Sequence, residues 1–277
     1  MSPTWHDENY PKAEKPGIIG WIFLILRAPI VLIVVFGGLL LSLLVRLIER
    51  RIYGLQRPIT PWITQAVCRG TLRVLGLRVK VRGPRMKGAG AIVANHSSWL
   101  DIFVLNSRKN IYFVSKAEVA KWPGIGWLAR ATGTMFINRD RREAKVQTQI
   151  MEDRLMQGHR LLFFPEGTST DGQRVLPFKT TLFAAFFSDR LKHELQLQSV
   201  SVLYHAPNGE DPRFYGWWGD MDFAPSLLKF LAQAKQGHVE LVYHDPVRVD
   251  DFANRKSLAA FMEAQVKQDF DRFLAEG

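Results

Sequence analysis

The sequence is poor in cysteine, and several common functional motifs are missing from it. Its single cysteine, Cys68, excludes an internal disulfide, CxxC redox chemistry and a thiolate zinc cluster. Neither GxGxxG nor GxxxxGK followed by Ser or Thr occurs, so no nucleotide phosphate loop is indicated. The chain has no internal repeat and no low-complexity tract, and its hydrophobic fraction of 47 % excludes a disordered or collagen-like protein.

Acidic residues are also in deficit. Asp and Glu number 26 against 37 Lys and Arg, which gives a formal net charge of +11 over 277 residues. Such an excess indicates an anionic partner surface, for which DNA, RNA and acidic lipid all qualify. A nucleic-acid partner is disfavoured, because the sequence has no zinc finger, RNP box or helix-turn-helix pattern. No metal site is predicted, since the histidines are scattered and unpaired.

The apolar residues are concentrated near the N-terminus. A polar leader, residues 1–16, precedes an apolar run over residues 17–26, and after Arg27 residues 28–45 carry no charge. This second run is at the lower limit for a helix that crosses a bilayer. A secretory signal is disfavoured by acidic residues in the leader, and a buried core helix by the lack of a polar stripe. We therefore predict an N-terminal membrane segment.

The flanks of this segment predict its orientation. The C-terminal flank has four arginines and one acid, whereas the N-terminal flank has two lysines and three acids. By the positive-inside rule, the C-terminal flank and the domain after it lie in the cytoplasm. Arg27 and Pro29 leave a second geometry open, in which the helix breaks and forms a re-entrant hairpin in one leaflet. The four arginines are Arg46, Arg50, Arg51 and Arg57.

Strand and helix patterns alternate in the rest of the chain. Alternating or short apolar patterns predict strands over 77–82, 89–94, 111–114, 160–164, 199–204 and 239–243. Amphipathic patterns predict helices over 61–75, 142–158 and 255–274, with Cys68 as a small core residue on the first. This order is typical of the α/β class. We predict a mixed, mostly parallel sheet flanked by helices.

The first candidate site residues follow the strand at 89–94. Asn95, His96 and Ser97 lie in a strand-to-helix loop, where open α/β sheets place reactive groups. Histidine suits general-base catalysis near neutral pH, and a carboxylate such as Asp101 commonly orients it. The two can meet if His96 lies in the loop and Asp101 in the first helical turn, with Ser97 or Ser98 as the N-cap. Alternatively, Asp101 only caps the helix and His96 is an ordinary surface histidine.

Two further segments carry polar groups. FPEGT, residues 164–168, directly follows the strand at 160–164, so it should face the same edge of the sheet as His96. Its Glu166 is costly after a buried strand unless it faces a cleft, although a bare turn is the alternative, and Gly167 permits unusual backbone angles. GTMFINR, residues 133–139, ends in Arg139, whose planar fork can bind a phosphate or a carboxylate. Arg141 and Arg142 are expected to be solvated.

Together, these segments resemble the motifs of the glycerolipid and lysophospholipid acyltransferases. The family pattern is an N-H-x-x-x-x-D box, a G-x-x-F-I-x-R box and an F-P-E-G-T box, and the sequence carries all three in this order. The resemblance covers residues 60–205 or so, although residues 200–202 read Val-Ser-Val where the family usually has a Val-Pro pair. It divides the chain into a membrane anchor, residues 1–57, and an acyltransferase domain, residues 58–277.

The resemblance implies a role for each group. His96 would be the general base that deprotonates the acceptor hydroxyl, and Asp101 would orient it. The acceptor would be bound by Phe136, Arg139, Glu166, Gly167 and Thr168. Residues that would support the site are Asn95, Ser97, Phe164, Pro165 and Lys179. The acyl donor would be a thioester of coenzyme A or of acyl carrier protein, which is already activated, so neither a Ser or Cys nucleophile nor a cofactor is needed.

The resemblance therefore predicts a membrane-bound O-acyltransferase at the bacterial inner membrane, with its catalytic domain on the cytoplasmic side. The leading acceptor is 1-acyl-sn-glycerol 3-phosphate, which would give phosphatidic acid. The alternative is lyso-ornithine lipid, because Arg139 can bind either a phosphate or a carboxylate. An aromatic stretch at 213–221 loosely resembles the lyso-ornithine lipid acyltransferases, and it is either an acceptor-selecting loop or a packed excursion. A non-enzymatic lipid-binding protein is less favoured, because both His96 and Asp101 are present.

Overall fold

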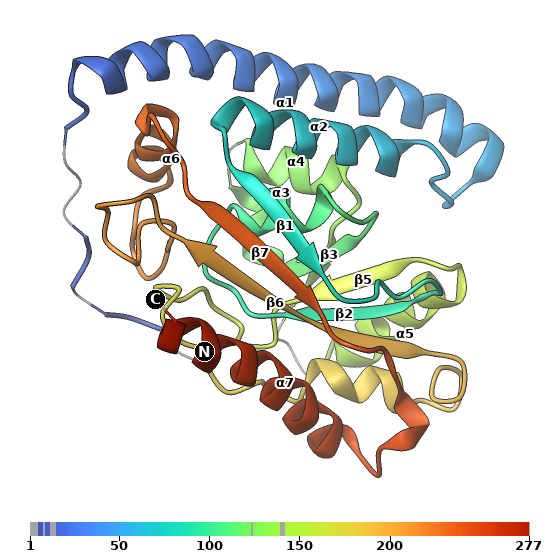
Figure 1. Ribbon diagram of the computed structural model, residues 1–277. Coiled ribbons are helices and arrows are strands. Elements are labelled where there is room, and N and C mark those ends of the chain that lie inside the picture. The colour runs from blue at the N-terminus through green and yellow to red at the C-terminus, as the bar shows by residue number, and fades with distance from the viewer. Residues whose placement is uncertain (1–4, 8, 12–14, 123, 139–141, 277) are drawn as a thin grey trace.

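The computed structural model describes residues 5–7, 9–11, 15–122, 124–138 and 142–276. A sheet lies between two layers of helices (Figure 1). Its strands are β1 (Arg78–Arg82), β2 (Gly90–Ala94), β3 (Tyr112–Lys116), β4 (Met135–Ile137), β5 (Arg160–Phe163), β6 (Gln196–His205), β7 (His238–Tyr243) and β8 (Val247–Arg248). The α-helices are α1 (Ile18–Tyr53), α2 (Thr60–Leu75), α3 (Asp101–Asn106), α4 (Ile125–Ala131), α5 (Ala144–Met156), α6 (Phe223–Ala232) and α7 (Arg255–Glu276). Short 3-10 turns are η1 (Ala117–Lys121), η2 (Leu182–Phe187) and η3 (Val249–Asp251).

The sheet is mostly parallel, as predicted. Its strand order is β1-β7-β6-β2-β5-β3-β4, and β8 pairs with β6. Of the pairings between described residues, β6 with β7 and β6 with β8 are antiparallel, and the others are parallel. Each predicted strand and helix is present with ends shifted by a few residues, whereas β4, β8, α4 and α6 were not predicted. The predicted fold class is confirmed.

The central strands are buried on both faces. Along β2, Ile92 packs into the core under α2, α3 and α6, while Ala91 and Val93 face the core under α5 and α7. This alternation follows from the two-residue period of a strand. Because helices cover both faces, β2 reads as a continuous apolar run rather than as an alternating pattern.

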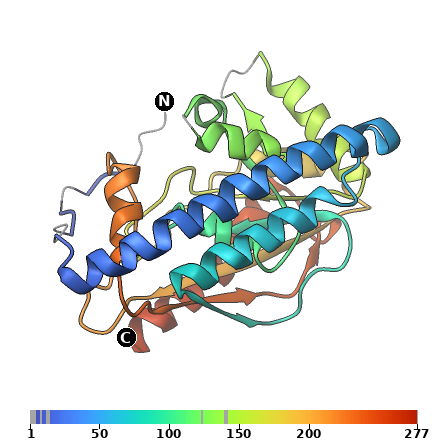
Figure 2. The ribbon, with the colours of Figure 1, turned by 90° about the horizontal axis from the view of Figure 1, so that it is seen from above.

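Helix α1 is one continuous helix of 36 residues, about 54 Å long at 1.5 Å per residue. It packs against α2, α6 and α4, and it lies along one side of the domain beside α2 (Figures 1 and 2). The helix does not break at Arg27 and Pro29, so the re-entrant hairpin does not form. Arg27 instead donates hydrogen bonds to the carbonyls of Leu231 and Gln233 at the end of α6. That end is rich in unpaired carbonyls, which attract a guanidinium.

The apolar side chains of α1 are largely exposed. In its most apolar stretch only 17 % of the residues are buried, and Ile33 and Leu47 are each 72 % exposed. A core helix would bury these side chains, so the core-helix alternative does not fit the structure. Helix α1 has the length and composition of a membrane helix, and its exposed surface is suited to membrane association.

A buried carboxylate joins α1 to α2. Glu49 is 1 % exposed, and its oxygens accept hydrogen bonds from the amides of Ile59 and Thr60 and from the Thr60 hydroxyl, at 2.7–3.1 Å. These amides are those of the N-cap residue, Ile59, and of the first residue of α2, and the N-cap side chain supplies no acceptor of its own. The expected boundary after residue 57 falls within this connection and stays a prediction.

Candidate active site

Two of the predicted motifs meet at one edge of the sheet. β2 and β5 are neighbouring parallel strands, so the loops that follow them lie side by side. His96 follows β2 and Phe164 follows β5, and their rings stack with centroids 4.0 Å apart and planes 9° apart. Each loop was predicted to face this edge. The structure brings them into direct contact.

His96 and Asp101 form a hydrogen-bonded pair. The Nδ1 atom of His96 lies 2.7 Å from Oδ2 of Asp101. Asp101 is fully buried, whereas the His96 side chain is 21 % exposed. A carboxylate can only accept at Nδ1, so the neutral form of this imidazole has its hydrogen on Nδ1 and its lone pair on Nε2. This is the arrangement that a general base requires.

Asp101 also holds the loop itself. Its Oδ2 accepts hydrogen bonds from the amides of Ser97 and Ser98, at 3.0 and 3.1 Å. Asp101 thus contacts His96, as the orienting alternative requires, and also holds two loop amides that precede α3; its role in catalysis stays a prediction. The prediction that Ser97 or Ser98 is the N-cap is wrong, because α3 begins at Asp101 with Leu100 before it. The hydroxyl of Ser98 instead accepts the Leu100 amide at 3.3 Å.

The other oxygen of Asp101 is held by a residue outside the three motifs. The Tyr204 hydroxyl donates to Oδ1 of Asp101 at 2.7 Å. Burial, followed by the Asp101 charge, raises the pKa of Tyr204 well above its usual value, so the hydroxyl keeps its proton and remains a donor. Sequence reasoning missed this contact: Tyr204 lies on a predicted strand, but it is 103 residues away from Asp101 and no local spacing connects them.

Asn95 fixes the start of the loop. Its amide nitrogen donates to the Val202 carbonyl at 3.0 Å, and its oxygen accepts from the Val202 amide at 2.8 Å. The side chain thus continues the pairing of β2 with β6 by one residue beyond Ala94. Val202 belongs to the segment that departs from the family's Val-Pro pattern. The backbone there keeps an N–H group that Asn95 uses.

Glu166 joins the two loops from within. It is 1 % exposed, and its oxygens accept from the His96 amide at 2.7 Å and the Leu176 amide at 2.8 Å. Burial raises the pKa of Glu166 to about 8, and the two amide hydrogen bonds oppose that rise. Both oxygens are engaged by backbone amides, so this carboxyl positions the His96 loop. Its contact with an acceptor stays a prediction.

The rest of the second motif shapes the loop. Gly167 has a φ of 72°, a left-handed conformation that favours glycine. The Pro165 carbonyl accepts the Lys179 amide at 2.9 Å, which links the motif to the segment after it. Thr168 is buried, and its hydroxyl donates to the neighbouring carbonyl of Ser169 at 3.3 Å.

The third motif is described in part. Phe136 lies half-buried on β4, which pairs with β3 on the far side of β5. Arg139 and Arg141, on which predictions were made, lie outside the described residues. Among the residues that are described, no group of three His, Cys, Asp or Glu side chains could hold a metal ion.

The aromatic stretch at 213–221 packs against the site. Phe214, Tyr215 and Trp218 are each at most 4 % exposed, which fits a packed excursion. Trp217 instead touches the His96 loop: its amide donates to the Ser97 carbonyl at 2.9 Å, and its ring lies 6.1 Å from that of Trp122. The stretch therefore closes the core and also borders the His96 loop.

The described residues of the N-terminal leader contact the same stretch, which the polar composition of the leader did not predict. Trp5 and Tyr10 pack on Trp218, with ring centroids 6.1 and 5.6 Å away. The Trp218 indole donates to the Asp7 carbonyl at 3.1 Å. The described leader residues thus lie against the aromatic stretch that borders the His96 loop.

Comparison with known proteins agrees with this geometry. The Acyltransferase family profile matches residues 78–192. The chain is 57 % identical over 265 residues to the lyso-ornithine lipid O-acyltransferase of Rhodobacter capsulatus, covering 96 % of both chains. It is 33 % identical over 145 residues to the 1-acyl-sn-glycerol-3-phosphate acyltransferase of Neisseria meningitidis, covering 51 % of this chain and 55 % of that protein.

A solved structure shares the fold. The crystal structure of the 1-acyl-sn-glycerophosphate acyltransferase of Thermotoga maritima superposes with a TM-score of 0.64 at 22 % identity, and the match covers 92 % of this chain and 94 % of the other. Matching motifs, a matching fold and identity along nearly the whole chain lead to one conclusion. The chain belongs to the acyltransferase family that includes the lyso-ornithine lipid O-acyltransferases, and it is an acyltransferase.

Proposed function

We propose that this enzyme transfers a fatty acyl chain to the free hydroxyl of lyso-ornithine lipid, which yields ornithine lipid. The observation that carries the proposal is the 57 % identity over 96 % of both chains with the Rhodobacter capsulatus enzyme. The glycerophosphate-acylating relative from Neisseria matches only 51 % of the chain, at 33 % identity. The family resemblance made 1-acyl-sn-glycerol 3-phosphate the leading acceptor, although the motifs do not separate the two, and the comparisons support lyso-ornithine lipid better.

In this proposal His96 is the general base. Its Nε2 removes the proton of the acceptor hydroxyl, and the oxygen attacks the carbonyl carbon of the acyl thioester. The new C–O ester bond forms as the C–S bond breaks, and the departing thiolate takes the proton back from the imidazolium. Asp101, at 2.7 Å from Nδ1, stabilises the imidazolium between these transfers.

No covalent acyl-enzyme is required, because a thioester is already activated. Cys68, the single cysteine, is buried within α2, and burial raises its pKa to about 12, so it stays a thiol. The donor is the thioester of coenzyme A or of acyl carrier protein. Phe136, Gly167 and Thr168 would line the acceptor site, and Arg139 would bind the ornithine carboxylate as a bidentate fork.

We also propose that the enzyme acts at the cytoplasmic face of the bacterial inner membrane. The exposed apolar side chains of α1 support attachment to a bilayer. Arg50 and Arg51 in its last turn are exposed and would meet the acidic cytoplasmic leaflet. The enzyme and its lipid acceptor would then be held at the same membrane surface.

An acylation assay with two acceptors tests the proposal. The full chain in mixed micelles receives a radiolabelled acyl thioester with either lyso-ornithine lipid or 1-acyl-sn-glycerol 3-phosphate. We expect kcat/KM to be at least about tenfold higher with lyso-ornithine lipid, a difference of about 1.4 kcal/mol in transition-state stabilisation. A preference for the glycerophosphate acceptor would reject the proposal.

Two histidine variants separate catalysis from folding. His96→Ala should lower kcat by about 10²–10⁴-fold, the usual contribution of a general base. The matched control is His193→Ala, because His193 also faces a carboxylate, Asp250 at 3.3 Å, but is 67 % exposed and lies outside the motifs. The control should keep wild-type turnover.

A further inference from the structure

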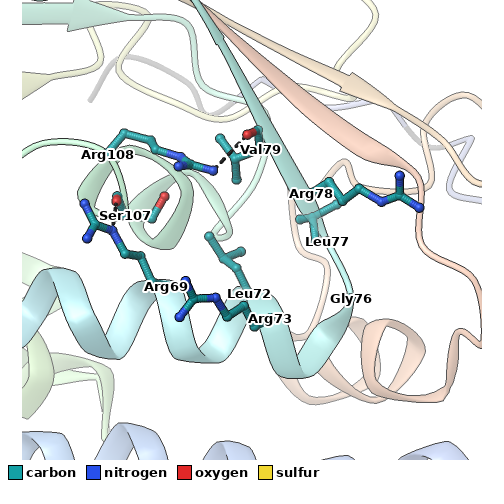
Figure 3. A pocket seen from close by; sticks show the side chains of 9 residues that line it. All are labelled: Arg69, Leu72, Arg73, Gly76, Leu77, Arg78, Val79, Ser107 and Arg108. Carbon is teal, nitrogen blue, oxygen red and sulfur yellow. Dashed lines mark hydrogen bonds between the residues drawn. The ribbon is translucent and has the colours of Figure 1, made fainter.

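A basic pocket lies away from the His96 site. It is an open cavity of about 830 Å³ between α2, the start of β1 and the end of α3 (Figure 3). A volume of this size lies within the range of small-molecule sites. Four arginines line it, and Leu72 and Leu77 supply buried apolar surface. The arginines are Arg69, Arg73, Arg78 and Arg108.

Three of these guanidinium groups have unsatisfied hydrogen-bonding capacity. The Nε of Arg69 donates a hydrogen bond to the Ser107 carbonyl at 2.7 Å, and the Nη2 of Arg108 donates one to the Val79 carbonyl at 2.8 Å. The Nε of Arg108 is buried without a partner, and the Arg73 side chain makes no hydrogen bond within the described part of the chain. In that same part, none of the pocket arginines is ion-paired with a carboxylate.

Helix capping does not account for this cluster. α2 and α3 both end at the pocket, and each helix end carries about half a negative charge. Two such ends offset about one of the positive charges of Arg69, Arg73 and Arg108. Burial, and then the neighbouring guanidinium of Arg69, lower the pKa of Arg108. The pocket therefore keeps a positive charge that the described chain does not neutralise.

We propose that this pocket binds a phosphate ester group through Arg69, Arg73 and Arg108. Guanidinium groups bind phosphate through paired, charge-assisted hydrogen bonds, and the unused N–H groups supply the donors. The cavity is larger than inorganic phosphate needs, which favours an organic phosphate. Two sources share this chemistry: the headgroup of an anionic phospholipid, and the phosphates of coenzyme A.

The pocket is connected to the catalytic pair but separate from it. α3 begins at Asp101 and ends at Asn106, next to Ser107 and Arg108 of the pocket. Six residues of helix span about 9 Å. None of the predicted catalytic or acceptor residues lines the pocket. The proposal therefore does not depend on which acceptor the enzyme uses.

Calorimetric titration of the full chain in neutral detergent tests the site. One arm uses dihexanoyl-phosphatidylglycerol, with zwitterionic dihexanoyl-phosphatidylcholine as the reference of zero net charge, and the other arm uses coenzyme A. The test variant is R69Q/R73Q, and R73Q alone removes a side chain that makes no hydrogen bond in the described structure. The charge-matched control is R255Q/K267Q, since both residues are exposed on α7 across the sheet.

We expect R69Q/R73Q to bind dihexanoyl-phosphatidylglycerol, coenzyme A or both at least about tenfold more weakly than the wild type does. The affinities of the control should stay within about twofold of the wild-type values. Loss confined to the phosphatidylglycerol arm would assign the site to a lipid headgroup, and loss confined to the coenzyme A arm to the donor. R73Q alone should weaken binding about threefold. The proposal is overturned if R69Q/R73Q binds like the control in both arms. The two-acceptor assay above is independent of this outcome.

Discussion

Tyr204→Phe is the most informative single change outside the family motifs. The substitution removes one hydroxyl and leaves the ring, which is 6 % exposed, in place. Among the described residues, this hydroxyl is the partner of Oδ1 of Asp101, while Oδ2 keeps three donors. A buried carboxylate oxygen would thus lose a hydrogen bond of the kind that contributes about 1.5–3 kcal/mol.

The loss should divide between folding and catalysis. We expect the free energy of unfolding to fall by about 1.5–3 kcal/mol. With Oδ1 free, the carboxylate is held from one side only and orients His96 less well. We expect kcat to fall about tenfold, or about 1.4 kcal/mol, with KM unchanged, because Tyr204 acts through Asp101 and not on the substrate.

Tyr215→Phe is the matched control. Tyr215 is also buried, at 1 % exposure, and its ring lies 5.3 Å from that of Tyr204. Its hydroxyl contacts Gln236 and the Gly237 amide, not Asp101. The control should lose stability but keep kcat, measured by acyl transfer at saturating substrate and by thermal unfolding. An equal loss of kcat in both variants, or no loss of kcat in either variant, would refute the positioning role of Tyr204.

Three further changes test the structure. Burial, and then the charge of Arg154, lower the pKa of His159 from 6.5 to about 4, which favours the neutral form of its side chain. His159 therefore contributes stability above pH 6.5 that is lost as the pH falls toward 4, and its partial exposure limits this contribution to about 1–2 kcal/mol. Thermal midpoints of His159→Gln should accordingly be less acid-sensitive than those of the wild type. Glu49→Ala leaves buried α2 amides unpaired and should cost about 3 kcal/mol in unfolding free energy, whereas an unchanged melting temperature would contradict the α1–α2 link. Gly167→Ala places a Cβ at a φ of 72° and should cost about 1–2 kcal/mol, measured in the same way, while wild-type stability would show that this backbone is not strained.

The sequence predicted the two loops of the site because the signals are local. His96 and Glu166 each follow a short apolar strand, and neighbouring parallel strands end at one edge. The contacts that complete the site are not local. Tyr204 reaches Asp101 across 103 residues, and the two amides that hold Glu166 come from different loops. No residue pattern within a window reports such pairs.

At the N-terminus, the local sequence pattern and the tertiary contacts favour different structures. Arg27 interrupts an apolar run, and a charge followed by Pro29 can break a helix. The helix continues because the end of α6, about 200 residues away, offers carbonyls to Arg27, a tertiary contact that overrides the local signal. β4 was missed for a simpler reason, since three residues are too short for a periodic pattern.

The most direct test of the central claim is lipid analysis of cells that make lyso-ornithine lipid but cannot acylate it. Such cells receive either the wild-type chain or its His96→Ala form, and lipids are quantified by mass spectrometry. We predict that the wild type converts lyso-ornithine lipid to ornithine lipid and that His96→Ala, present at an equal level in the membrane fraction, does not. Ornithine lipid formed equally well by His96→Ala, or not formed by the wild type, would contradict that claim.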